Sequence, residues 1–498
     1  MAGTISNCDT KGREEQTVVA DLDGAVLVSG DFSSFQYFFL VAVEAGSFLR
    51  GAFLLLLYPL VCFLRRFVSV SSAVQTMIFV STAGVKLRDI ELAAKAVLPK
   101  FYASDVREDA WRVLGSCRRR ILVSAYPTVM VLPFARDLLA TDAVVGTEIE
   151  VDRRTGRATG LVKSPGVAVG ELKTLAAERA LDGELADLGI GVTESDYSFT
   201  GICKENYLVH SDTCATVVQP HHLNKSIIFH DGRLVNRPTP MNALMVYLWL
   251  PLGFILALLR VHLFSFLPIS LVLPIYRLFG VNIIVRGTPP PPPSLNSPGS
   301  MFVCNHRTLL DAVIIHVALQ RRISTVTYSL GRVSELLSPI LLVRLTRDRA
   351  TDKKLISTFL DNGDLIICPE GTTSRGRVLL RFSPLFAELS DRVVPVAVEC
   401  RQSMFYGNTA RGWKSMDVYF FFMNPRVQYE VSFLDGLAKE QTCMGGASAI
   451  DVANHVQRII GAKLGFECTM LTRRDKYMAL SGNDGKVQAT VSSTKMPL

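Results

Sequence analysis

The chain has 498 residues, enough for about three domains of typical size, so a single small binding module is excluded. Hydrophobic residues make up 49%, charged residues 20%, and the mean hydropathy is +0.29, which exclude an intrinsically disordered protein. The formal net charge of +8 suits an anionic membrane surface or a phosphate-bearing substrate, but it is too dilute to indicate a nucleic-acid partner. The ten cysteines form no short-spaced framework, so we expect reduced thiols in the cytosol.

The first motif follows a polar tail, residues 1–16, which lacks the apolar core of a secretory signal. Residues 17–24 read TVVADLDG, a predicted strand that ends in the two carboxylates Asp21 and Asp23. If the strand geometry continues, these side chains point the same way and can flank one magnesium ion.

This motif resembles that of the haloacid-dehalogenase phosphatases, α/β proteins. The resemblance implies a nucleophile, an acid/base, a phosphoryl-holding hydroxyl, a charge-neutralising lysine and a late aspartate. These roles fall on Asp21, Asp23, Ser124, Lys173 (with Lys163 as an alternative) and Asp196.

Three positions depart from the phosphatase pattern. Val192 and Ser198 stand where competent members carry aspartate, and Ala25 replaces the usual threonine. Because valine cannot ligate magnesium, we expect a degenerate phosphatase site that needs no metal, with Mg²⁺ relevant only if residual activity survives through Asp196. The histidines between positions 210 and 230 match no standard zinc spacing, so no metal site is expected there.

Two apolar zones interrupt the chain. The zone near 35–67 is broken by Glu44 and Arg50, and we expect it to dip into a membrane or, alternatively, to form a buried core helix. Residues 241–259 carry no charge and are long enough to span or nearly span a bilayer, although a buried core helix is the alternative. Residues 263–276 are short and contain two prolines, so the pair is interpreted as a membrane hairpin or re-entrant loop.

A second motif follows the proline run at 289–293. Residues 301–304 are a predicted strand, and His306 in the next turn precedes Asp311, one helical turn further on. A carboxylate that fixes an imidazole tautomer makes the other ring nitrogen a base for a hydroxyl proton. Cys304 is interpreted as a buried strand thiol rather than an acyl-carrying nucleophile.

The third motif, PEGTTSR at 369–375, directly follows another apolar strand. Gly371 permits a tight turn, Thr372 offers a hydroxyl and an amide to a phosphate, and Arg375 can clamp it. Arg347, in VRLTRDR between the two motifs, carries a planar guanidinium that suits phosphate oxygens.

The blocks NHRTLLD, LTRDR, CPEGTTSR and VVPVAVE resemble those of the glycerolipid acyltransferases. The resemblance implies that His306 is the general base for a glycerol hydroxyl, Asp311 its orienting partner, and Arg347, Glu370 and Gly371 part of glycerol-phosphate binding. The hydroxyl would attack the thioester of acyl-CoA directly, without a cofactor.

Nearly the whole chain resembles the land-plant glycerol-3-phosphate acyltransferases of the sn-2 type. That family implies membrane association at the endoplasmic reticulum, cytosolic domains, a glycerol-3-phosphate substrate and a place in cutin and suberin synthesis. The alternatives are a bifunctional enzyme whose active phosphatase site releases 2-monoacylglycerol, and a non-catalytic membrane scaffold.

The expected fold is α/β: two α/β domains, haloacid-dehalogenase-like and then acyltransferase, separated by a membrane-embedded helical hairpin. The expected segments are a tail at 1–16, the first domain at 17–225, the hairpin at 226–280, a spacer at 281–300, the acyltransferase domain at 301–477 and a flexible tail at 478–498.

Overall fold

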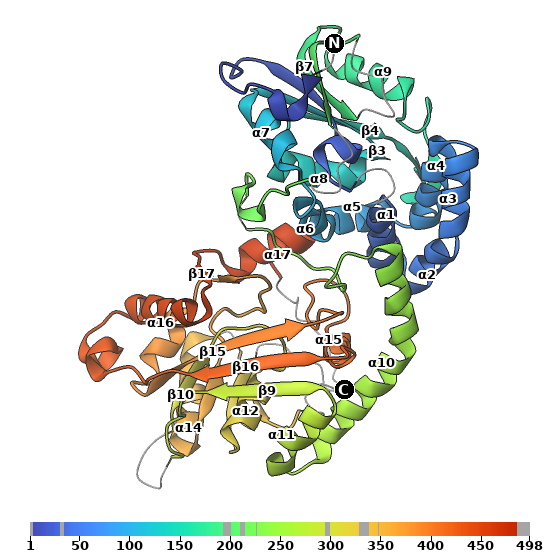
Figure 1. Ribbon diagram of the computed structural model, residues 1–498. Coiled ribbons are helices and arrows are strands. Elements are labelled where there is room, and N and C mark those ends of the chain that lie inside the picture. Colours follow the sequence, from blue (N-terminus) through green and yellow to red (C-terminus); the bar gives the residue numbers. More distant parts are fainter. Residues whose placement is uncertain are drawn as a thin grey trace, which may run out of the picture. The chain divides into compact units, whose positions relative to one another are not determined.

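The computed structural model describes residues 3–29, 34–192, 201–209, 215–225, 227–293, 299–327, 338–346 and 348–485, with the backbone alone at 264–266 and 349. The chain divides into two compact units, Met1–Leu248 and Trp249–Leu498 (Figure 1). Each unit is an α/β fold built on its own sheet, and each is described by itself below.

The first unit contains a six-stranded parallel sheet in the order β1-β8-β7-β2-β3-β4. Its strands are β1 (Gly3–Thr4), β2 (Thr17–Asp21), β3 (Arg119–Pro127), β4 (Ala143–Thr147), β7 (Ala186–Val192) and β8 (Cys203–Val209). Strand β5 (Ile149–Asp152) pairs antiparallel with β6 (Arg157–Val162) in a separate hairpin. The central strands β2 and β3 are buried, as expected for a doubly covered parallel sheet.

Helices cover the first sheet. Helix α9 shares a core cluster with β2 and β3 through apolar residues such as Val19, Ile121 and Ala177, and α8 packs on β3 and β4. The helices of this unit are α1 (Phe35–Val41), α2 (Phe48–Leu56), α3 (Tyr58–Phe67), α4 (Val70–Thr82), α5 (Leu87–Ala96), α6 (Leu98–Ala103), α7 (Glu108–Ser116), α8 (Thr128–Leu138) and α9 (Glu171–Ala180).

The first apolar zone divides into two parts with different surroundings. Every residue of α1 is buried, and the Tyr37 hydroxyl donates a 2.7 Å hydrogen bond to Asp105. In contrast, α2 and α3 expose large apolar side chains, and they form a pair bent by 44° that is apolar enough for a broken span or a re-entrant loop. The beginning of the zone is therefore a core helix, whereas its later part presents an apolar surface.

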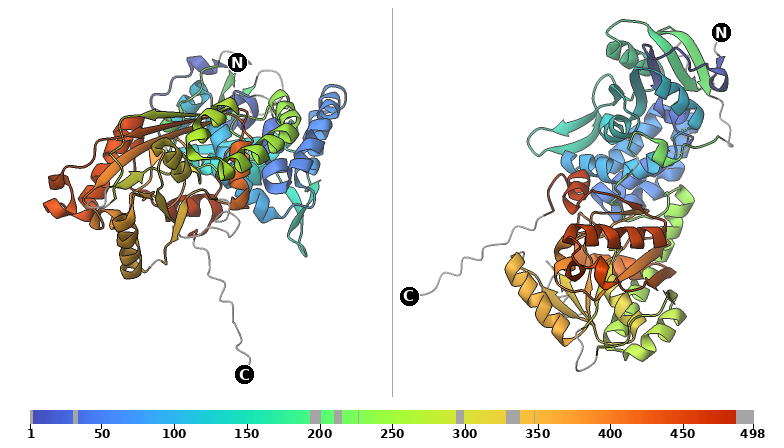
Figure 2. Two further views of the ribbon diagram at one scale, coloured as in Figure 1. Left: turned by 90° about the horizontal axis from the view of Figure 1, so that it is seen from below. Right: turned by 90° about the vertical axis from the view of Figure 1, so that its left-hand side faces the viewer.

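The second unit contains a seven-stranded mixed sheet in the order β12-β11-β13-β10-β15-β16-β9, with β15 and β16 antiparallel and the remaining pairs parallel (Figures 1 and 2). Its strands are β9 (Val281–Arg286), β10 (Met301–Cys304), β11 (Ser324–Thr327), β12 (Leu341–Arg344), β13 (Leu365–Ile367), β15 (Val393–Gln402) and β16 (Val427–Phe433), and β14 (Val378–Leu379) pairs with β17 (Glu467–Cys468) outside this sheet.

Helices α14 and α16 share a large apolar core with β10, β13 and β15, whereas α11 contacts β9, and α12 contacts both β9 and β16. The helices of this unit are α11 (Ile269–Leu278), α12 (Asp311–Leu319), α14 (Arg349–Asn362), α15 (Asp417–Phe422), α16 (Ala449–Leu464) and α17 (Arg473–Ser481). The carboxyl ends of β10 and β13 lie side by side in this arrangement, which brings two distant sequence motifs together.

Helix α10 (Pro240–Phe266) belongs to both units and contains the longest apolar segment described. Residues Pro240–Leu263 are long and apolar enough to cross a membrane, and 28% of their most apolar window is buried. Near its carboxyl end, the buried Arg260 guanidinium donates 2.6 Å hydrogen bonds to the backbone carbonyls of Phe422 and Asn424. The end of α10 is thus fixed to the second unit, while side chains such as Leu248 and Ile255 remain exposed.

Candidate active site

The site lies where β10 and β13 end. The Asn305 side chain pins the turn after β10 to β15, because it donates to the Val398 carbonyl and accepts from the Val398 amide, both at 2.8 Å. The Ser374 amide donates a 2.7 Å hydrogen bond to the His306 carbonyl, which ties this turn to the loop that follows β13. Two loops separated by more than 60 residues of sequence therefore form one wall.

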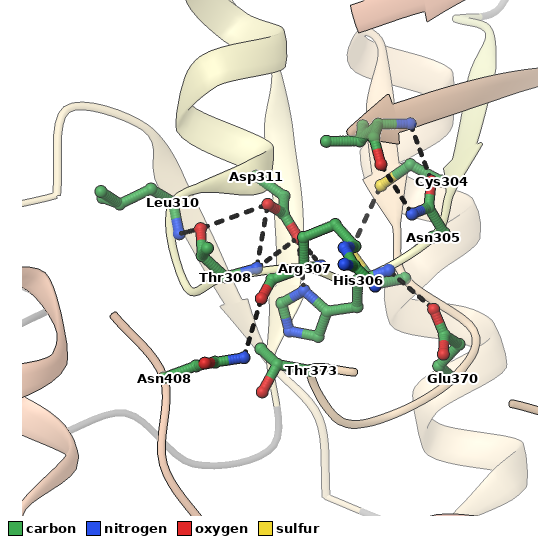
Figure 3. Close-up of polar contacts among 12 residues, drawn as sticks. Cys304, Asn305, His306, Arg307, Thr308, Leu310, Asp311, Glu370, Thr373 and Asn408 are labelled. Atoms are coloured by element: carbon green, nitrogen blue, oxygen red, sulfur yellow. Dashed lines mark hydrogen bonds and ion pairs between the residues drawn. The ribbon is translucent and has the colours of Figure 1, made fainter. Parts of the chain in front are cut away.

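His306 and Asp311 point toward one another in Figure 3, with Nδ1 of the imidazole 2.9 Å from Oδ2 of the carboxylate. Asp311 opens helix α12 and is completely buried. Its carboxylate also accepts hydrogen bonds from the Thr308 amide at 3.0 Å and from the Tyr429 hydroxyl at 2.8 Å. Because so many donors hold the carboxylate, it fixes the orientation of the imidazole ring.

The surroundings of His306 favour its protonated form. Burial by itself disfavours the charged imidazolium, but the Cys368 sulfur and the Asp311 carboxylate outweigh this effect and raise the pKa of His306 well above its usual value. An imidazole with a raised pKa is a stronger base, and it is active only while it is unprotonated.

Glu370 is buried directly behind this turn. Its Oε1 accepts a 2.8 Å hydrogen bond from the His306 amide, and its Oε2 accepts a 3.0 Å hydrogen bond from the Leu380 amide. Burial raises the pKa of Glu370 to about 7, although the two amides oppose this shift. The contacts described for Glu370 therefore hold the His306 backbone in place.

The remaining residues of the PEGTTSR motif have distinct surroundings. Gly371 adopts a φ of 65°, a conformation that side chains with a Cβ rarely take. Thr372 is buried at the wall of the site. Arg375 donates a 2.8 Å hydrogen bond to Asn408 Oδ1 and lies 4.1 Å from the ring centre of Tyr406. Arg347, also expected at this site, lies outside the described residues.

A cavity of about 360 Å³ opens beside the pair. His306, Thr372 and Thr373 are among its polar lining residues, and Gly371 also lines it. Apolar lining residues include Val313, Ile356, Ile367, Leu385, Phe386 and Phe422. The His306 imidazole thus faces a space whose lining offers polar groups to a polar substrate and apolar side chains to a hydrocarbon chain.

Sequence reasoning missed several residues of this site. Tyr429 reaches Asp311 from β16, and the buried Lys476 of α17 donates a 3.1 Å hydrogen bond to Thr372 Oγ1. Lys414 and Arg473 also line the cavity and add positive charge to its wall. The run LTRRDKY, which contains Arg473 and Lys476, was a usable sequence signal, whereas Tyr429 stands in an ordinary alternating strand.

A second constellation lies in the first unit. Lys173 Nζ is 2.9 and 2.8 Å from the two carboxylate oxygens of Asp21 and 3.2 Å from Asp23 Oδ2. Ser124 Oγ donates a 2.7 Å hydrogen bond to Asp23 Oδ1. The structure thus brings four of the five expected residues together, and Asp196 lies outside the described residues.

The backbone reaches this arrangement differently from the expectation. Strand β2 ends at Asp21, and a tight turn over Leu22–Val26 with Gly24 at a φ of 99° carries Asp23 to the lysine. The two carboxylates therefore converge through a turn, not through continued strand geometry.

The described residues at this place do not fit a magnesium ion. Both Asp21 oxygens accept from the Lys173 ammonium, and Ser124 and the Ala125 amide occupy Asp23. No group of three or more His, Cys, Asp or Glu side chains suited to a metal occurs in the described part of the chain. Val192, which ends β7, offers no ligand.

Comparisons with known proteins identify the family. A family model described as "Glycerol-3-phosphate acyltransferase RAM2-like, HAD-like domain" matches residues 17–209, and one described as "Acyltransferase" matches residues 285–399. Glycerol-3-phosphate acyltransferase RAM2 of Petunia hybrida is 49% identical over 469 residues, which cover 94% of this chain and 97% of the relative. The chain belongs to the plant glycerol-3-phosphate acyltransferase family.

A second curated relative agrees with this assignment. Glycerol-3-phosphate acyltransferase 1 of Arabidopsis thaliana is 39% identical, with 95% of this chain and 82% of the relative covered. Among solved structures, the 1-acyl-sn-glycerophosphate acyltransferase PlsC from Thermotoga maritima is 16% identical with a TM-score of 0.28, covering 45% of this chain and 91% of PlsC. The two plant relatives confirm the family expected from the sequence, and the chain is an enzyme of the acyltransferase class.

Proposed function

We propose that this protein transfers an acyl group from acyl-CoA to a hydroxyl of glycerol 3-phosphate, with His306 as the general base. The observation that carries the proposal is the His306–Asp311 pair, 2.9 Å apart, at the wall of a cavity lined by both polar and apolar side chains. Family membership supports both the reaction class and the acceptor.

The mechanism follows from the two nitrogens of the His306 ring. Because Asp311 holds Nδ1, the other nitrogen, Nε2, is the one that accepts the proton of the glycerol hydroxyl. The hydroxyl oxygen attacks the thioester carbonyl, the C–S bond then breaks, and the CoA thiolate leaves and recovers a proton from the imidazolium. The general base contributes about 100- to 10,000-fold to such a reaction.

Two buried groups act as positioning residues in this proposal. Glu370 holds the His306 amide, and Asn305 anchors the same turn to β15. Misplacing a catalytic group by about 1 Å costs on the order of 100-fold in rate. Glu370 therefore supports catalysis by fixing the base, and not by touching the substrate.

The phosphate of the acceptor would bind at the polar part of the cavity. Thr372 and Thr373 present hydroxyls there, and Lys414 and Arg473 supply positive charge. The family resemblance adds Arg347. Arg375 donates a hydrogen bond to Asn408 in the described structure, so we propose that it holds the loop after β13 in place rather than binding the phosphate.

The donor, the regiochemistry and the location are proposed from family likeness: acyl-CoA as donor, the sn-2 hydroxyl as acceptor, a role in cutin or suberin synthesis, and attachment to the endoplasmic reticulum membrane with cytosolic domains. The exposed apolar side chains of α10, α2 and α3 support membrane attachment. The expected hairpin would then consist of α10 and the short, proline-containing α11.

The product should keep its phosphate, because the phosphatase-like site holds a lysine between its two carboxylates and Val192 in place of a metal ligand. A bifunctional enzyme would release inorganic phosphate, and a scaffold would transfer no acyl group.

One experiment separates these functions. Purified full-length protein is incubated with glycerol 3-phosphate and labelled acyl-CoA, and lysophosphatidic acid isomers, monoacylglycerol and phosphate are quantified. We expect 2-acyl lysophosphatidic acid without phosphate release, and loss of at least about 100-fold in rate for His306→Ala. Unchanged activity of His306→Ala would reject the proposed base, and magnesium-dependent phosphate release that requires Asp21 would reject the degenerate site.

A further inference from the structure

A pair of cysteines lies directly behind the His306 turn. Nine of the ten cysteines fall within the described residues, and all nine are free thiols. The Sγ atoms of Cys304 and Cys368 are only 3.3 Å apart. Cys304 ends β10, and Cys368 follows β13. Neither the expected chemistry nor the proposed mechanism uses this pair of sulfurs.

The backbone geometry suits a bond between the two sulfurs. Strands β10 and β13 are parallel and in register, with Val303 opposite Ile367, so the two cysteines are the next opposing pair along the strands. Neighbouring strands lie about 4.7–4.9 Å apart, which falls within the Cα separation of about 4.4–6.8 Å found in disulfides. An S–S bond of about 2.05 Å therefore requires a shift of little more than 1 Å between the sulfurs, without moving the sheet.

The two thiols differ in access and reactivity. Cys368 is half-buried and lines the cavity beside His306, whereas Cys304 is completely buried. The hydrogen bond from Cys304, together with the charge of His306, lowers the pKa of Cys368 to about 6 against the opposing effect of burial. The pKa of Cys304 is raised by the same hydrogen bond and by burial. Cys368 is thus the more accessible of the two thiols and the one whose surroundings favour the thiolate, whereas those of Cys304 favour the protonated thiol.

We propose that Cys304 and Cys368 form a reversible disulfide that switches acyl transfer off, an inference that rests on the proposed role of His306. The oxidant is a peroxide. The Cys368 thiolate attacks a peroxide oxygen, so that an S–O bond forms, the O–O bond breaks and hydroxide leaves as water after taking a proton. The Cys304 thiol then attacks the sulfenic sulfur, and the S–S bond forms as the S–O bond breaks. Two thiols and one hydrogen peroxide give one disulfide and two waters, and a dithiol reductant reverses the change.

Oxidation would impair the base in two ways. It removes the charge of the Cys368 sulfur, which contributes to the raised pKa of His306. It also ties together the starts of the two loops that carry His306 and Glu370. The 2.8 Å hydrogen bond from the His306 amide to Glu370 depends on the spacing of these loops. The sheet itself stays in place, but His306 lies two residues after Cys304, and a shift of about 1 Å passed on to the imidazole is enough to lower the rate on the order of 100-fold.

The test uses the reduced full-length protein, treated with hydrogen peroxide and then with a thiol-blocking reagent. Peptides are analysed by mass spectrometry, and acyl transfer is measured in parallel. We expect a linked Cys304–Cys368 peptide that grows in proportion to the loss of activity, with both changes reversed by dithiothreitol. Absence of the linked peptide, or its formation without any loss of activity, would overturn the proposal.

Variants sharpen this test. Cys304→Ala leaves Cys368 without a resolving thiol, so continued peroxide treatment should carry Cys368 to sulfinic acid, and the activity loss should become irreversible. Cys304→Ser, which preserves side-chain size, repeats the experiment. Cys468→Ala removes an exposed cysteine of the same unit and should behave like the wild type. Recovery of Cys304→Ala by dithiothreitol to the wild-type extent would contradict the switch. The peptide measurement needs no acyl transfer, so it remains decisive if the proposed function itself fails.

Discussion

The hydroxyl of Tyr429 donates a 2.8 Å hydrogen bond to Oδ1 of Asp311, the carboxylate whose other oxygen faces His306. The site therefore contains a third positioning group, on a strand about 120 residues away from the histidine motif in the sequence.

Tyr429→Phe should lower kcat by about tenfold with little change in KM, because a hydrogen bond to a charged group contributes about 1.5–3 kcal/mol and 1.4 kcal/mol corresponds to a factor of ten. Steady-state kinetics with glycerol 3-phosphate check this expectation. Tyr276→Phe, at another buried tyrosine of the same unit, is the control and should keep the wild-type kcat. Equal effects of the two substitutions would indicate a general loss of packing.

The raised pKa of His306 predicts a pH profile. The base works only when unprotonated, so acyl transfer should be present above the raised pKa and be lost as the pH falls through it, with a midpoint above about 6.5. Asp311→Asn removes a negative charge that stabilises the imidazolium, so its acidic limb should move to lower pH while the maximal rate falls. If the acidic limb of kcat/KM stays at the same pH in Asp311→Asn, Asp311 does not act on the group that titrates.

The phosphate proposal predicts a selective binding defect. Arg473→Ala should raise the KM for glycerol 3-phosphate about tenfold, because a charge-assisted hydrogen bond contributes about 1.5–3 kcal/mol. The KM for acyl-CoA should change little. The neighbouring Arg474 is exposed and does not line the cavity, so Arg474→Ala is a matched control. A selective rise in the KM for acyl-CoA would instead assign Arg473 to the CoA phosphates.

The Lys173–Asp21 ion pair predicts a stability effect in the first unit. Asp21→Asn removes a negative charge that stabilises the buried Lys173 ammonium, and it should destabilise the unit by about 3–5 kcal/mol. Asp21→Asn combined with Lys173→Met should cost less than the sum of the two single substitutions, since the pair is removed together. Hydrogen exchange of the amides in β2 and β3 measures both effects. Strict additivity would show that the two groups are not energetically coupled.

The sequence was most informative where one short motif contains both partners. His306 and Asp311 are five residues apart, so one short segment of chain joins them. The proposed chemistry follows from this spacing and from the strand that precedes His306. The two α/β domains were predicted for a similar reason, because each buried parallel strand is a short apolar run.

Contacts across the sheet were not predictable in this way. Tyr429 and Lys476 reach the site from β16 and α17, and their positions depend on strand order and helix docking, which no local pattern encodes. Asp23 reaches Lys173 through a turn with a positive φ at Gly24. The motif alone did not predict where the strand ends and this turn begins. Apolar composition likewise could not distinguish the buried α1 from the exposed α2, since phenylalanine and leucine make up more than half of both segments.

The anchoring of α10 by Arg260 bears on how a product would depart. The next residue, Val261, lines the cavity, so the helix that is long enough to cross a bilayer also forms part of the cavity wall. If this helix is embedded in lipid, as proposed above, a newly esterified chain would move sideways into the leaflet rather than desorb through water. Each methylene spared from hydration avoids about 0.8 kcal/mol, a saving that grows with every carbon of the fatty acid.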